Sequence, residues 1–140
     1  MINSFTVGKL CLMILYFISG LGKIKNFNHT SIDLKNKFEN KFKFVSLPLL
    51  FYKIVLTLVI ILLIFGSLWI SFSKYFKLNI NKIYLNYFNF FIKYALILFT
   101  TLATYLYHYP AVGKDFHHFF KNLSIIGGFL ILLNNSDDLF

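Results

Sequence analysis

The stretch from Leu49 to Phe72, LLFYKIVLTLVIILLIFGSLWISF, constrains the fold more than any other part of the chain. It contains no charged residue from Ile54 onward. About 20 consecutive apolar residues in a helix cross the hydrocarbon core of a bilayer, which is about 30 Å thick. Pro48 precedes the run, as is common at helix starts, and Trp69 lies near its far end, where interfacial aromatic residues collect. The stretch therefore predicts a transmembrane helix.

Three more apolar segments have the length of a membrane span. The four predicted spans cover approximately residues 5–22, 49–72, 83–107 and 116–133. Of the 140 residues, 58% are hydrophobic and only 14% are charged, whereas an ordinary globular domain has about 25% charged residues. A soluble domain of this size would need more polar surface. The sequence predicts an all-α fold, a single four-helix transmembrane bundle over residues 1–140, in an integral, multi-pass membrane protein.

The segment between the first two spans has the pattern of a surface helix. Leu34, Phe38 and Phe42 recur at helical spacing with lysines between them, and Ser31 followed by Asp33 is typical of a helix start. Basic amphipathic helices lie flat at a membrane interface. We therefore expect a short amphipathic interfacial helix here, with a solvated loop as the alternative.

All fourteen basic residues are lysines, and the net charge is +9. Because most of the lysines flank the apolar segments, the charge favours lipid headgroups over nucleic acid as its partner. Taken together, the connections after the first and third spans hold seven lysines, whereas the connection after the second holds three. The positive-inside rule then places those two connections in the cytoplasm and both termini outside.

Polar residues gather on one face of two of the predicted spans. Polar groups inside a membrane face other helices rather than lipid, so these faces predict a polar pocket near one membrane surface. In the alternative, the threonine hydroxyls bond to their own helix and Lys93 extends to the headgroups. The candidate pocket residues are Lys9, Tyr16, Ser19, Gly20, Lys23, Lys93, Thr100, Thr104, His108, Lys121 and Asn122.

The last predicted span carries small residues at helical spacing. Ser124, Gly127 and Gly128 form a flat surface that lets another helix approach closely, so we predict that they serve helix packing. Cys11 is the single cysteine, which excludes an internal disulfide or dithiol couple.

Three histidines, His108, His117 and His118, occur near the adjoining ends of the third and fourth spans. Neighbouring histidines on a helix point about 100° apart, so a shared metal ion is disfavoured and no metal site is predicted. A quinone headgroup site built from His108, Lys93, Tyr105 and Lys23 is an alternative. The sequence shows no phosphate loop, nucleophile elbow or paired carboxylates, so whether the chain is an enzyme stays open.

The order of several motifs is similar to that of the DoxX-like integral membrane proteins. The first span pairs Lys9 with a small-Gly-x-x-Lys ending at Gly20 and Lys23; Pro48 and Gly66 mark the second span. The third and fourth spans carry the remaining motifs, namely His108, the pair Lys121 and Asn122, and the pair Gly127 and Gly128.

The chain also departs from that family. DoxX-like proteins usually have arginine where Lys9 stands, and many have a glutamate in the second span, where Leu56 and its neighbours are apolar. Relatives include subunits of a thiosulfate–quinone oxidoreductase and membrane partners of oxidative-stress enzymes. The resemblance implies a redox-associated membrane subunit or scaffold without catalysis of its own, with a soluble or membrane redox partner. A quinone-linked oxidoreductase and a lipid or small-molecule carrier are the alternatives.

Overall fold

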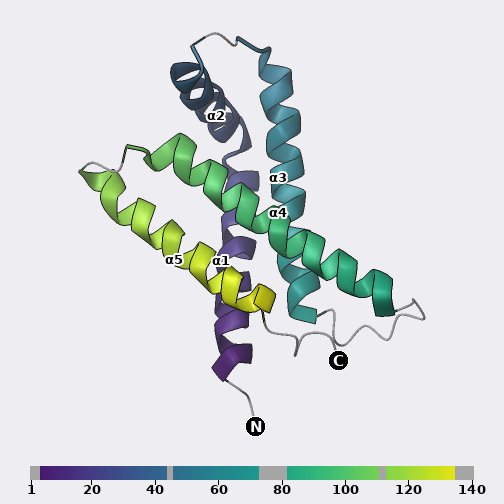
Figure 1. The fold of residues 1–140 in the computed structure, drawn as a ribbon. Helices are drawn as coiled ribbons and strands as arrows, with labels where there is room; N and C mark the ends of the chain where they lie inside the picture. Colours follow the sequence, from purple (N-terminus) through teal and green to yellow (C-terminus); the bar gives the residue numbers. More distant parts are fainter. Residues whose placement is uncertain (1–3, 44–45, 73–81, 111–112, 135–140) are drawn as a thin grey trace.

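The computed structural model describes residues 4–43, 46–72, 82–110 and 113–134, except for the side chains of residues 82, 114 and 134. These residues form helices and no strand, which confirms the all-α prediction. The helices, coloured in chain order in Figure 1, are α1 (Ser4–Lys25), α2 (Phe27–Lys41), α3 (Leu49–Phe72), α4 (Lys82–His108) and α5 (Lys114–Asn134).

Four of the described helices are long and apolar enough to cross a membrane. They cover Ser4–Lys25, Leu49–Phe72, Ile83–His108 and Asp115–Leu133. Each overlaps one of the predicted spans. Neither Asp nor Glu occurs in α3, and lysines stand in the last turn of α1, where a span would meet the headgroups.

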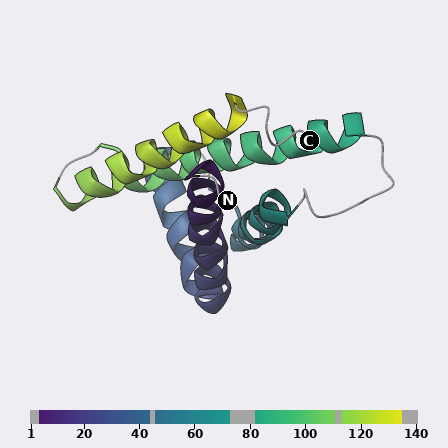
Figure 2. The ribbon, with the colours of Figure 1, turned by 90° about the horizontal axis from the view of Figure 1, so that it is seen from below.

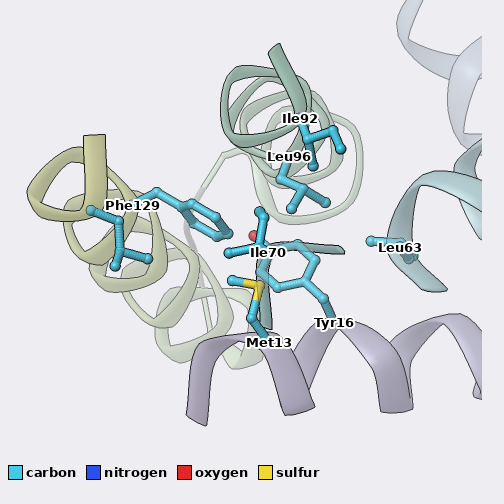
Figure 3. Packing of buried hydrophobic residues seen from close by; sticks show 8 residues of the cluster. Met13, Tyr16, Leu63, Ile70, Ile92, Leu96 and Phe129 are labelled. Carbon is cyan, nitrogen blue, oxygen red and sulfur yellow. The ribbon is translucent and has the colours of Figure 1, made fainter. Parts of the chain in front are cut away.

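The long helices are arranged as two pairs. Helix α1 packs along α3, and α4 packs along α5, with the second pair running obliquely across the first (Figures 1 and 2). The shared core lies where the pairs cross. Figure 3 shows Met13 and Tyr16 of α1 pointing toward Leu96 of α4 and Phe129 of α5, all of them buried. Tyr16 meets the Phe129 ring edge to face, with centroids 5.3 Å apart.

Two glycines permit the closest contacts between helices. A Cβ at Gly20 of α1 would lie 2.7 Å from Ile64 Cγ1 of α3, closer than atoms can approach. A Cβ at Gly128 of α5 would lie 3.0 Å from Leu12 Cδ1 of α1. Small residues at such points let apolar helices pack backbone to backbone.

The segment between α1 and α3 differs from the prediction. Helix α2 is 15 residues long and begins at Phe27 rather than at Ser31. Ser31 is buried, and its hydroxyl donates to the Asn28 carbonyl in the first turn. The helix packs against α3 and α4 instead of lying apart from the other helices. The prediction of a short interfacial helix is therefore not borne out, and the alternative of a solvated loop is wrong.

Candidate ligand cavity

A cavity of about 560 Å³ lies among all five helices. The lining comes from the second half of α1, the start of α2, the first half of α3, the last third of α4 and the middle of α5. About half of the lining is aliphatic or phenylalanine, including Leu34, Val55, Leu56, Val59, Phe99, Leu102, Leu106 and Ile125. The polar lining residues are Tyr16, Ser19, Lys23, His29, Thr30, Asp33, Thr100, Tyr107, His108, Lys121 and Asn122.

Tyr16 and Thr100 form the most buried polar contact of the lining. The Thr100 hydroxyl donates to the Leu96 carbonyl of its own helix at 2.8 Å, so the Tyr16 hydroxyl donates to Thr100 Oγ1. Thr104 likewise donates to the Thr100 carbonyl at 2.6 Å. Thr100 and Thr104 thus donate to carbonyls of their own helix, as expected in the alternative to a polar pocket. Thr100 also accepts a hydrogen bond from Tyr16 of α1.

Lys23 is the cation of α1 in the cavity wall. Its ammonium donates one hydrogen bond to Ser19 Oγ at 2.9 Å, one helical turn earlier. The nitrogen also lies 5.9 Å from the centre of the Phe99 ring of α4. Among the described residues, no carboxylate lies within ion-pair distance of this ammonium.

Helix α2 supplies the carboxylate of the cavity. Asp33 lines the cavity from the second turn of α2, and Tyr107 lines it near the end of α4. His29 and Thr30, one turn earlier on α2, also line the cavity. Helix α2 therefore gives the described cavity lining its one acidic side chain.

His108 joins the ends of α4 and α5. Its Nδ1 lies 3.2 Å from Asp115 Oδ1, and its ring stacks on His118 with centroids 5.1 Å apart. His117 is exposed beside them. Across the described part of the chain, no three His, Cys, Asp or Glu side chains are placed to hold a metal ion. His108 of α4 thus links to α5 through Asp115 and His118.

The structure brings together seven of the eleven predicted pocket residues. These are Tyr16, Ser19, Lys23, Thr100, His108, Lys121 and Asn122. Lys9, Gly20, Lys93 and Thr104 lie outside the lining. Gly20 packs against α3 instead. The Thr104 side chain is buried and donates to a carbonyl of its own helix.

Lys93 is the clearest departure from the predicted pocket and from the predicted quinone headgroup site. Its side chain is buried, and its ammonium donates to the Leu132 carbonyl at the far end of α5, 3.1 Å away. It therefore neither reaches the cavity nor extends to the surface. Tyr105 also lies outside the lining, with its ring 4.5 Å from the Lys41 ammonium. Only Lys23 and His108 of that predicted site share the cavity.

The three predicted packing residues of α5 occupy different surroundings. Gly128 contacts Leu12 of α1, whereas no described atom lies within 4 Å of a Cβ built at Gly127. Ser124 is exposed, and its hydroxyl donates to the Phe120 carbonyl of its own helix at 3.0 Å. Cys11 is exposed on α1.

Sequence reasoning missed the contribution of α2. The sequence pattern places His29, Thr30 and Asp33 in a surface segment, and it gives Tyr107 only as the end of the third predicted span. A usable signal was present: Asp33 is the acidic residue closest in sequence to the lysine-rich end of α1. If the connecting helix folds back along α1, this carboxylate comes close to the lysines at the end of α1.

No protein-family model matches the chain, and no curated protein or solved structure matches it either.

Proposed function

We propose that this chain is a multi-pass integral membrane protein that binds a small amphipathic molecule in the cavity between the five described helices. The observation that carries the proposal is the composition of the wall. Charged groups stand at one end, from Lys23, Asp33 and His108. Deeper along the spans the wall consists of aliphatic groups such as Leu15 and Val59, and the polar pair there, Tyr16 and Thr100, bond to each other.

The size of the cavity suits such a ligand. Binding sites for small molecules typically have volumes of about 300–1,000 Å³ and combine mostly apolar walls with a few polar groups that fix orientation. The cavity volume of about 560 Å³ falls within this range, and all five helices contribute to its wall.

The cavity also extends to the lateral surface of the helices. Leu15 of α1 and Leu102 of α4 line it, and both remain half-exposed, at 53% and 52%. They stand on predicted spans, where the surroundings would be lipid chains. An amphipathic molecule could then keep its tail in the hydrocarbon while its head occupies the polar end.

The outward faces of the long helices support residence in a membrane. They expose large apolar side chains in every span, including Ile14, Ile18, Leu58, Ile61, Leu98 and Ile131. In water, apolar surface of this extent would drive association. In a bilayer, lipid chains would cover this apolar surface without such association.

A redox-associated role remains a second proposal. It rests on the resemblance to DoxX-like proteins, in which the chain would act as a non-catalytic membrane subunit beside a redox partner protein. A quinone is one amphipathic molecule that the cavity could accept, because Lys23, His108 and Tyr107 could donate hydrogen bonds to its carbonyls. That version predicts quinone in the purified protein.

Mass spectrometry of the protein released from gently prepared lipid nanodiscs tests the proposal. We expect a stoichiometric amphipathic small molecule to accompany the wild-type chain. Ala103→Trp, which fills the cavity, should lose it. The matched control, Leu130→Trp on the exposed face of α5, should retain it. Equal ligand content in both variants would contradict binding in the cavity.

A further inference from the structure

The ammonium of Lys23 has unused hydrogen-bonding capacity. An ammonium carries three N–H donors, and the described residues engage one of them, through Ser19 Oγ at 2.9 Å. The Phe99 ring offers its face at 5.9 Å but no lone pair. A cation in such an apolar wall is stabilised best by an anion that accepts the remaining donors.

Asp33 is the only carboxylate among the described lining residues, and it forms no described ion pair with Lys23. Lys121 of α5 adds a second cation to the wall. His108 has its own carboxylate neighbour, Asp115, which lies outside the lining. The polar end of the cavity therefore has more positive than negative groups.

We infer that the cavity selects amphiphiles whose head is an anion, a carboxylate or a phosphate, held by the Lys23 ammonium. This inference rests on the proposed function, because it assumes that an amphiphile enters the cavity.

The placement of Lys23 fits a ligand that lies along the spans. Lys23 is in the last turn of α1, close to the end where a span meets the headgroups. Ser19, Tyr16 and Leu15 follow along the same wall toward the middle of the helix. From Lys23 to Leu15 the helix rises about 12 Å at 1.5 Å per residue. A head at Lys23 thus places the first part of an alkyl chain beside Leu15 and Val59, and the rest can leave past Leu102.

Three fluorescent probes with the same C16 tail test the inference: a carboxylate, a phosphate monoester and an alcohol. Each is titrated into the full chain in nanodiscs of zwitterionic lipid. We expect at least one anionic probe to bind about tenfold or more tightly than the alcohol. Charge-assisted hydrogen bonds are roughly twice as strong as neutral ones, and a difference of about 1.4 kcal/mol corresponds to tenfold in affinity. The two anionic arms distinguish a fatty-acid type of ligand from a phosphate-headed lipid.

Substitutions at two lysines of the same helix locate the effect. Lys23→Met keeps most of the aliphatic stem and should remove the preference for the anion while leaving alcohol binding within about twofold. Lys23→Arg should retain the preference. The control is Lys25→Met, at an exposed position outside the cavity lining, which changes the net charge equally and should leave the preference intact.

The outcomes separate the two proposals. Equal affinity for all three probes in wild type, each abolished by Ala103→Trp, would overturn the inference and keep the cavity as an amphiphile site. Loss of the anion preference in Lys25→Met as well as in Lys23→Met would also overturn it, since surface charge would then explain the effect. Failure of every probe to bind wild type would overturn the proposed function itself.

Discussion

The hydroxyl of Tyr16 on α1 donates a hydrogen bond to Thr100 Oγ1 on α4, 84 positions later in the chain. Both side chains are buried, and both line the cavity. The bond therefore ties one helix pair to the other at the wall of the proposed ligand site. Its loss should affect the packing of the pairs and the shape of the cavity together.

Replacing both partners measures this bond directly. Tyr16→Phe should lower the free energy of unfolding by about 1–2 kcal/mol, since it removes a buried donor and leaves the ring in place. In a double-mutant cycle with Thr100→Val, measured by titration with SDS in mixed micelles, we expect a coupling energy of about 1 kcal/mol. Tyr87→Phe, at an exposed position of α4, is the control and should change nothing measurable. Strict additivity of the two substitutions would argue against the bond.

The contact of α1 with α3 makes a sharp prediction for two glycines of one helix. Gly20→Ala places a Cβ 2.7 Å from Ile64 Cγ1, so the helices must separate. We expect destabilisation of about 1–3 kcal/mol, the usual cost of overpacking. Gly22→Ala meets no described atom within 4 Å and should be neutral or stabilising, because alanine favours the helix. Thermal unfolding in detergent compares the two, and equal melting temperatures would exclude the close approach of α1 and α3.

Lys93 belongs to the pocket that sequence periodicity predicts, but it lies outside the described cavity. Its ammonium bonds to Leu132 near the end of α5, away from the cavity lining. Lys93→Met should therefore leave the affinity for an anionic C16 probe within about twofold. A tenfold weakening, similar to that expected for Lys23→Met, would place Lys93 at the ligand and contradict the described geometry.

Lys41 holds the end of α2 against α4. Its ammonium donates to the main-chain oxygens of Tyr105 and Tyr109, and it lies 4.5 Å from the Tyr105 ring centre. Carbonyls near a helix end lack partners within the helix, so a cation there is favourable. Lys41→Met should speed hydrogen exchange of the α2 amides several-fold, as expected for a loss of about 1 kcal/mol. Lys37→Met, an exposed change on the same helix, is the control.

The four long helices could be predicted because their composition alone specifies them. A run such as Leu49–Phe72, without Asp or Glu, has one favourable environment whatever its neighbours are. The start of α2 was harder to predict. Asn26 makes no side-chain capping bond, so the helix begins at Phe27 without the expected signal at Ser31. Its docking on α3 and α4 depends on contacts between distant segments, which local periodicity does not contain.

The candidate site was predictable along α1 and only partly along α4. On α1, Tyr16, Ser19 and Lys23 lie on one face and share the cavity wall. On α4 the same argument joined Lys93 to Thr100 and His108. Because α4 crosses the α1–α3 pair obliquely (Figure 2), its polar face meets different helices along its length, and Lys93 ends at α5. The helical periodicity of polar residues shows which side of a helix they share, but it does not show which other helix packs against that side.

The passage of four helices through a bilayer underlies the whole account, and cysteine accessibility in sealed membrane vesicles tests it most directly. In a Cys11→Ser background, single cysteines replace Asn36 of α2, His117 of α5, Ser4 of α1 and Phe72 of α3, and a membrane-impermeant maleimide is added from one side. We predict that Asn36→Cys and His117→Cys are labelled from one side and Ser4→Cys and Phe72→Cys from the other. The lysine distribution further predicts the cytoplasmic side for the first two. Labelling of all four from the same side would contradict a four-span membrane protein.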